Sequence, residues 1–228
     1  MGVDVTEAVL SCLGSGVIPP SINQTSITLI PKVKSPTKVS EYRPISLCNI
    51  IYKLVSKMIT NRLKRMLPLS ISKSQSAFQL DKAIFDNILV AFETLYHMKN
   101  QKKRGEGGFM ALKLGMSKAF NRVEWNFLEA IMMKMGFGAR WVALVLSYTN
   151  SASYSILANG VPKGDIRPSR GIRQRDPLSP YLFLICLEAL NCQLQQAARS
   201  EAIRGFSLCK NGPEISHLFF ADDTLLFC

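Results

Sequence analysis

Two adjacent aspartates, Asp222 and Asp223, separate two short apolar segments of the chain. The segments Ile215–Phe220 and Thr224–Phe227 have the length and composition of buried strands, so the stretch predicts a tight hairpin with both carboxylates at its tip. Carboxylate oxygens presented in this way are the ligands that hard divalent cations prefer. Taken alone the pattern stays ambiguous, because a pair of aspartates is more often a solvated turn without a ligand.

The remaining patterns mix helices with short strands. Apolar residues recur at helical spacing in the segments that we expect to form helices, which are Val5–Leu13, Asn49–Leu67, Asp86–Met98, Trp125–Met135, Trp141–Tyr148 and Leu178–Leu194. Further strands are predicted at Thr25–Ile30, Phe109–Leu114 and Tyr154–Ala158, the last of them opening a hairpin that turns at Asn159-Gly160. Helices followed by helices mixed with hairpins are typical of an α+β fold.

Three details of this pattern can be tested in a structure. Pro68 should end the second predicted helix, because proline removes a backbone donor. The basic, glycine-rich segment Lys99–Gly108 is interpreted as an exposed loop. The strand Phe109–Leu114 should pair with the aspartate hairpin in one antiparallel sheet, which would make Gly115 and Asp222 near neighbours.

Composition and charge limit the class of protein. The 228 residues are 47% apolar and 19% charged, which is typical of globular proteins. The formal charge of +12 favours a polyanionic partner, although an ordinary basic protein stays an alternative. No signal peptide opens the chain and the apolar run Tyr181–Leu187 is too short to span a bilayer, so we expect an intracellular protein without a membrane partner, in the nucleus or the cytoplasm. The six cysteines and two histidines are scattered, so no zinc site is expected.

Several further boxes precede the aspartate pair along the chain. They are Thr28–Lys32, Tyr42–Leu47, Gln75–Phe78, Asp86–Leu89, Lys113–Trp125 and Gly171–Pro180. In this order, and followed by Phe220–Asp223, they resemble the successive motifs of reverse transcriptases from non-LTR (LINE-type) retrotransposons, in particular plant copies. The resemblance extends from about Ser26 to Cys228. It depends on the ordered set, because any one of these boxes could occur by chance.

This resemblance implies a right-hand polymerase with fingers and palm, in which an antiparallel palm sheet packs on helices. It implies an N-terminal and fingers-like region at residues 1–108 and an incomplete palm at residues 109–228. The implied activity is RNA-directed DNA polymerisation on an RNA template and a DNA primer. Two Mg²⁺ (or Mn²⁺) ions held by palm aspartates activate the attacking 3′-hydroxyl and stabilise the leaving pyrophosphate.

Two residues match the family's second aspartate motif. These are Asp222 and Asp223, the expected catalytic and metal-binding residues.

Four further residues match positions that contact the nucleotide. Lys32 and Arg43 match fingers positions at the triphosphate, where an ammonium and a guanidinium suit phosphate oxygens. Phe120 matches the aromatic residue that excludes a ribose 2′-hydroxyl, and Gln174 matches the residue beside the templating pair. Outside the ordered set, each of these four would be interpreted as an ordinary surface, core or loop residue.

The sequence departs from the family at several positions. Gly115 stands where the family has its first catalytic aspartate. Losing even an outer partner of a metal ligand typically costs about 10–100-fold in affinity or activity, so we expect weakened Mg²⁺ binding and no polymerase activity. Asn121 replaces a second aspartate of the same box, and Arg175 replaces a glycine that lets the backbone approach the nucleotide. Lys82 stands where the family usually has an arginine.

The sequence ends at Cys228, so we expect the thumb to be absent and interpret the chain as a degenerate, truncated copy of the domain. Three alternatives stay open. The chain could be a retained RNA-binding module without chemistry, another palm polymerase such as a group II intron maturase, or a translated remnant without a role. The amino-acid sequence of the segment Arg173–Pro180 resembles LINE-type elements more than it resembles maturases.

Overall fold

The computed structural model describes residues 2–72, 74–78, 84–100, 108–209 and 212–228. Its elements in chain order are α1 (Gly2–Ser15), α2 (Pro20–Asn23), β1 (Gln24–Pro31), η1 (Val39–Glu41), β2 (Tyr42–Cys48), α3 (Ile50–Ser70), α4 (Ile84–Asn100), β3 (Ala111–Gly115), η2 (Ala119–Arg122), α5 (Trp125–Lys134), α6 (Ala139–Asn150), β4 (Ser153–Ala158), β5 (Val161–Ile166), α7 (Ser179–Arg199), β6 (Phe206–Ser207), β7 (Glu214–Ile215), β8 (His217–Phe220) and β9 (Asp223–Phe227). Helices together with sheets in which all but one of the strand pairs are antiparallel confirm the α+β class. Two expectations lie outside the described residues: the departure at Lys82, and most of the loop at Lys99–Gly108.

The chain forms two compact units. The first combines Met1–Leu63 with Phe120–Phe183, and the second combines Lys64–Ala119 with Leu184–Cys228. Helices α3 and α7 contribute residues to both units. The division at residue 108, which the resemblance implies, stays a prediction.

α3 shows that periodicity predicts a helix better than it predicts where the helix ends. Fully buried apolar residues repeat every four positions along it: Val55, Ile59 and Leu63. The prediction that Pro68 ends this helix is wrong, because α3 continues to Ser70. Proline removes one donor, but the amide of Ile71 still donates to the carbonyl oxygen of Leu67 at 2.8 Å, so the last turn closes around the ring. None of the helices in the described ranges has the length and apolar character needed to cross a membrane.

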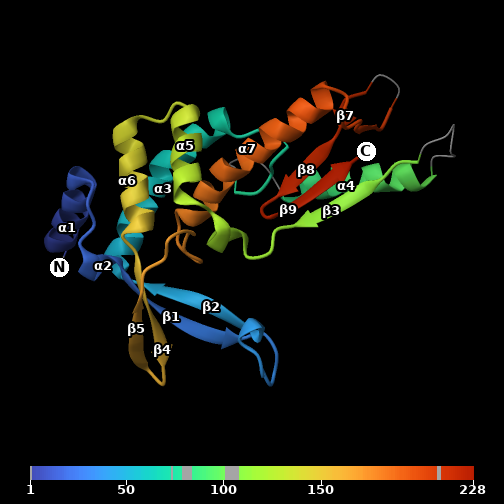
Figure 1. Cartoon of the computed structure of the whole chain (residues 1–228). Coiled ribbons are helices and arrows are strands. Elements are labelled where there is room, and N and C mark those ends of the chain that lie inside the picture. The colour runs from blue at the N-terminus through green and yellow to red at the C-terminus, as the bar shows by residue number, and fades with distance from the viewer. Residues whose placement is uncertain (1, 73, 79–83, 101–107, 210–211) are drawn as a thin grey trace. The chain divides into compact units, whose positions relative to one another are not determined.

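A four-stranded sheet in the order β2-β1-β4-β5 forms the strand layer of the first unit (Figure 1). β1 pairs antiparallel with β2 and parallel with β4, although β3 and several helices separate β1 from β4 in sequence. β4 and β5 form the predicted hairpin. Asn159 and Gly160 have φ values of 52° and 80°, and positive φ at both central residues is what a type I′ hairpin turn requires.

Nothing in the apolar pattern predicts β2, because Pro44 lies inside it. The sheet order explains why the strand nevertheless forms. β2 is an edge strand, and an edge strand has a row of backbone groups without partners, where a missing donor is tolerated.

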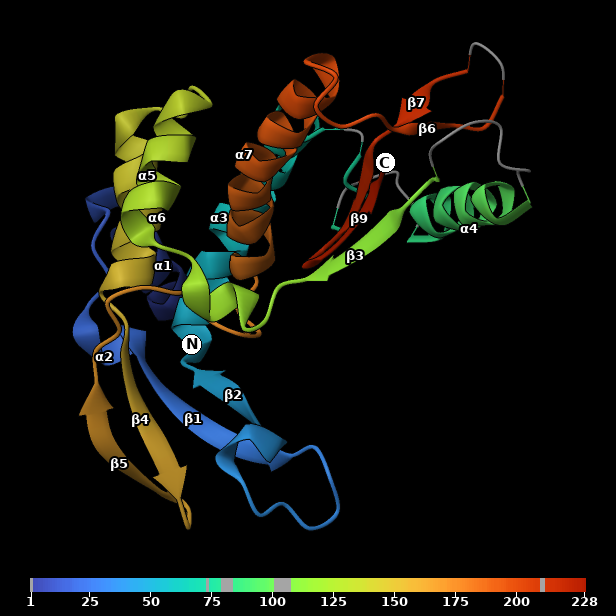
Figure 2. The ribbon, with the colours of Figure 1, turned by 45° about the vertical axis from the view of Figure 1, so that its right-hand side comes forward.

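The predicted palm strands meet in the second unit, where Figure 2 shows β3 beside β9. β3, β9 and β8 form an antiparallel sheet in that order, with Gly115 opposite Asp223. This confirms that Phe109–Leu114 and the aspartate hairpin join in one sheet. It also confirms that Gly115 lies next to the aspartate pair.

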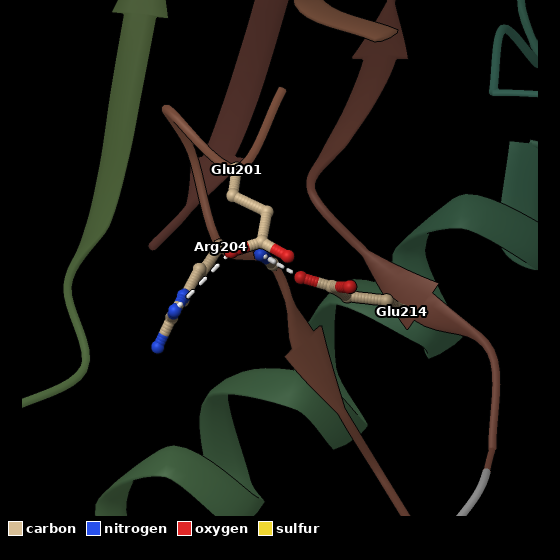
Figure 3. Close-up of polar contacts among 4 residues, drawn as sticks. Glu201, Arg204 and Glu214 are labelled. Carbon is tan, nitrogen blue, oxygen red and sulfur yellow. Dashed lines mark hydrogen bonds and ion pairs between the residues drawn. The ribbon is translucent and has the colours of Figure 1, made fainter. Parts of the chain in front are cut away.

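The segment after α7 contains a glycine that no other residue can replace without movement. Arg204 forms an ion pair with Glu201 at 3.4 Å, and the Glu214 carboxylate accepts a hydrogen bond from the amide of Gly205 (Figure 3). A Cβ atom at Gly205 would lie 2.7 Å from the carbonyl carbon and oxygen of Ile215. Real Cβ atoms do not come so close to backbone, so the approach of this segment to β7 requires glycine.

Candidate functional site

The two aspartates lie at the tip of the β8–β9 hairpin. Phe220 and Asp223 are the last paired residues, so Ala221 and Asp222 form a two-residue turn. Ala221 has a φ of 51°, the positive value that the first central residue of such a turn requires. Asp222 is exposed, and 46% of the Asp223 side chain is accessible. The hairpin therefore presents both carboxylates at its tip.

Gly115 is the residue of β3 that faces this pair. It lies opposite Asp223 in the sheet, and the amide of Met116 donates to the carbonyl oxygen of Asp222 at 3.3 Å. A Cβ atom at Gly115 would lie 3.4 Å from Oδ1 of Asp223, an ordinary van der Waals distance. A Cβ therefore fits at this position, and the side chain on it would start beside the Asp223 carboxylate.

The Asp223 carboxylate has a cationic neighbour on the same strand as Gly115. The ammonium nitrogen of Lys113 lies 3.2 Å from Oδ2 of Asp223. Both side chains are well exposed, at 66% and 46%, so the pair stabilises the fold by at most about 1 kcal/mol. Its chemical effect is to place a positive charge against one of the two carboxylates.

A two-metal centre needs more ligands than this hairpin provides. The resemblance implies that carboxylates from two aspartate motifs hold the two ions of such a centre close together. Gly115 supplies no ligand, and Asp223 is paired with Lys113. In the part of the chain that the structure describes, no group of three or more His, Cys, Asp or Glu side chains could hold a metal ion. The residues present therefore do not fit two divalent ions.

The four candidate nucleotide-contact residues belong to the first unit. Lys32 directly follows β1, and Arg43 on β2 pairs with Ile30 near the same end of the two strands. Both basic side chains are exposed. The ammonium of Lys32 donates to the carbonyl oxygen of Ser40 at 2.7 Å, so it helps to close the connection between the strands. Strand pairing thus brings these two residues together, and their role at a triphosphate stays a prediction.

The boxes that contain Phe120 and Gln174 are joined by backbone hydrogen bonding. The amide of Ile172 donates to the carbonyl oxygen of Phe120 at 2.9 Å. The Phe120 ring is stacked on Phe183 with the centroids 5.1 Å apart. Gln174 lines a cavity of about 270 Å³ together with Asn121, one of the departures from the family. The first unit therefore brings Asn121 of one box and Gln174 of the other to one cavity, and the roles of Phe120 and Gln174 at a nucleotide stay predictions.

Arg173 and Asp176, on either side of Gln174 in sequence, belong to a buried polar network that was not predicted from the sequence. Arg173 and Asp176 are each only 5% exposed. The Arg173 guanidinium donates to the backbone and side-chain oxygens of Asn23, and its central carbon lies 4.2 Å from the centroid of the Tyr52 ring. The hydroxyl groups of Tyr52 and Ser56 donate to the Asp176 carboxylate. Burial raises the pKa of Asp176 above its ordinary value, and the hydrogen bond from Ser56, the charge of Arg173 and the hydrogen bond from Tyr52 oppose this shift.

Arg175 stands where the resemblance implies a glycine, and its backbone conformation gives a physical reason for that glycine. Its φ is 64°, in the left-handed region that glycine adopts without cost. A residue with a Cβ atom in this region is strained by about 1–2 kcal/mol. Glycine is therefore expected here for its conformation as well as for its small size.

Comparison with known proteins shows what the chain is similar to. Residues 30–228 match the reverse transcriptase (RNA-dependent DNA polymerase) family. The chain is 27% identical over 226 residues to "Transposon TX1 uncharacterized 149 kDa protein" of Xenopus laevis, which covers 99% of this chain and 17% of that protein. It is 24% identical over 212 residues to "Retrovirus-related Pol polyprotein from type-1 retrotransposable element R2" of Popillia japonica, which covers 92% of this chain and 28% of that protein.

Other similarities agree with these. The chain is 27% identical over 179 residues to "RNA-directed DNA polymerase from mobile element jockey" of Drosophila melanogaster, with 77% of this chain and 19% of that protein covered. A solved structure of apo telomerase from Candida tropicalis has a TM-score of 0.59 at 13% identity, with 98% of this chain and 48% of that chain covered, which shows a shared fold. The chain spans less than a third of the length of these three sequence relatives.

Proposed function

This chain belongs to the reverse transcriptase (RNA-dependent DNA polymerase) family, as the reverse transcriptase domain of a LINE-type element, and we propose that it binds nucleic acid without polymerising nucleotides. Membership of the family implies a template, a primer and divalent metal ions. The proposal separates binding, which depends on basic side chains, from chemistry, which depends on the metal ligands.

The register of β3 against β9 carries the proposal. It sets Gly115 opposite Asp223. The resemblance implies an aspartate at position 115, and glycine supplies no carboxylate there. Members of the family use divalent metal ions to activate the attacking hydroxyl and to stabilise the leaving group. Asp222 and Asp223 alone do not fit that centre, so we expect Mg²⁺ or Mn²⁺ to bind weakly and the attacking hydroxyl to stay unactivated.

RNA in the position of a template is the partner that we expect the chain to keep. The formal charge of +12 supports this, as do the exposed Lys53 and Lys57 on α3 and the exposed Lys32 and Arg43. A telomerase from Candida albicans with a TM-score of 0.58 was solved in complex with a fragment of telomeric RNA. Basic side chains bind phosphates by releasing counterions, so this binding needs no metal centre. A DNA primer paired to the RNA is the second partner that the family implies.

Fluorescence polarisation with a labelled single-stranded RNA tests the binding half of the proposal. Each neutralised phosphate contributes about −0.7 to the slope of log affinity against log salt, so four contacts predict a loss of about 50-fold between 50 and 200 mM salt. Lys53→Gln together with Lys57→Gln should make this slope shallower by about 1.4. Lys134→Gln, which removes an exposed lysine of α5, is the control and should change the slope little. An affinity that does not depend on salt would contradict RNA binding by this surface.

A further inference from the structure

Lys113 has no role among the family positions matched above, yet it contacts Asp223, one of the two aspartates at the hairpin tip. We propose that the ammonium group of Lys113 takes the place of a divalent metal ion beside Asp223. The negative charge of the hairpin tip is then partly neutralised by a side chain of the same protein, and the tip is not simply a metal centre with one ligand missing. The proposal rests on family membership only in taking the hairpin tip as a metal-binding position.

The geometry around Asp223 assigns one side of the carboxylate to each neighbour on β3. Oδ2 lies 3.2 Å from the ammonium nitrogen of Lys113. Oδ1 faces Gly115, where an added Cβ atom would lie 3.4 Å away. Lys113 and Gly115 are two positions apart on one strand, so they face the same side of the sheet. A cation and a missing carboxylate therefore meet at the same aspartate.

The charges at the tip show why this arrangement disfavours a metal ion. Asp222 and Asp223 together carry two negative charges, and Lys113 reduces the local sum to one. A dication that approaches Asp223 must displace the ammonium or stay close to it, and both alternatives cost electrostatic free energy. The pair is well exposed, so the ammonium can be displaced at sufficient metal concentration. We therefore expect competition between Lys113 and a metal ion, with a measurable midpoint.

Titration with Mn²⁺ measures this competition directly, because bound Mn²⁺ broadens the amide signals of nearby residues in NMR spectra. In the full chain, Lys113→Met should lower the Mn²⁺ concentration that half-broadens the signals of Asp222 and Asp223 by up to about fivefold, the factor that corresponds to the most an exposed ion pair contributes. Gly115→Asp should lower it further by adding a carboxylate, and the double variant should bind most tightly. Lys163→Met, which removes an exposed strand lysine from β5, is the matched control and should leave the midpoint unchanged.

Equal midpoints for the native chain and Lys113→Met would overturn the proposal, as would an equal shift in Lys163→Met. If Gly115→Asp does not fold, the comparison of the two lysine variants decides the question alone. Neither result depends on RNA binding or nucleotide incorporation, so failure of the proposed function would be seen separately.

Discussion

Backbone conformation at single residues explains two features of this chain that side chains alone do not. Ala221 has positive φ because a two-residue hairpin turn carries the aspartates, and the short alanine side chain limits the strain. Arg175 has positive φ directly after Gln174, at a position that the family fills with glycine. The sequence indicated that position 175 mattered, but a φ value cannot be read from one sequence, so the reason came only with the structure.

Arg175→Gly should stabilise the protein by about 1 kcal/mol, because glycine relieves the left-handed strain and only part of the gain is offset by its freedom in the unfolded chain. Urea unfolding measures the change. The control is Arg167→Gly, at an exposed position whose φ is not positive, and it should give no gain. A loss of stability in Arg175→Gly would show that the arginine side chain makes contacts that outweigh the strain.

Gly205→Ala should destabilise the second unit by about 1–3 kcal/mol, the usual cost of forcing atoms into a packed region. The added Cβ atom would lie 2.7 Å from the backbone of Ile215, and neither backbone segment can rotate away as a side chain could. Gly108→Ala is the control, because a Cβ atom there meets nothing within 4 Å. Chemical unfolding of both variants gives the comparison, and equal stabilities would contradict the close approach.

At the scale of elements, the sequence predicted what local pattern determines and missed what distant partners determine. The helices and the palm hairpin follow from periodicity, and the pairing of β3 with β9 follows from the two apolar segments that flank Gly115 and the aspartate pair. β2 was not predicted because Pro44 lies within it, and proline is unusual inside a strand. The parallel pairing of β1 with β4 was not predicted because no local pattern indicates a pairing between strands so far apart in sequence. The prediction that Pro68 ends α3 was wrong because a proline in the last helical turn costs only one hydrogen bond.

The candidate site divides in the same way. The hairpin with Asp222 and Asp223, and the position of Gly115 beside them, could be predicted from the motifs. The network of Arg173 and Asp176 could not, because its partners on α2 and α3 lie far away in sequence. The ion pair of Lys113 with Asp223 escaped prediction for a related reason, since it depends on the sheet register.

Asp176 makes the stability of the first unit depend on pH. Its folded pKa is raised above the ordinary value of 3.8, mainly by burial, so protonation favours the folded state. The contribution of Asp176 is therefore complete below its ordinary pKa of 3.8 and is lost as pH rises through the folded pKa. Asp176→Asn should remove this dependence, so the stability of the native protein should fall relative to this variant as pH rises above that ordinary value.

Thermal or urea unfolding of both proteins across this pH range measures the effect. Asp176→Ala is the contrasting variant and should cost about 1–3 kcal/mol at every pH, because the hydroxyl groups of Tyr52 and Ser56 lose their acceptor. A native protein that gains stability relative to Asp176→Asn as pH rises would contradict the raised pKa.

At the scale of the whole molecule, binding and chemistry draw on different features. The net charge of +12 is a property of the entire chain, and substitutions at a single site leave most of it in place. Polymerisation instead requires that a few carboxylates hold metal ions together, so one residue can remove it. We therefore expect this chain to lack catalysis because of Gly115 and to keep an affinity for RNA.

Nucleotide incorporation on a primed RNA template, with Mg²⁺ or Mn²⁺, asks whether Gly115 has abolished polymerisation. The native chain should incorporate nothing, either alone or joined to the thumb of an active family member. The joined chain repaired by Gly115→Asp and Arg175→Gly should give detectable extension, which Asp222→Ala should abolish, and Asn121→Asp should add a smaller gain. Gly115→Asp alone should not suffice, because Arg175 would still crowd the nucleotide. Robust incorporation by the native chain, with Gly115 in place, would contradict the loss of polymerase activity.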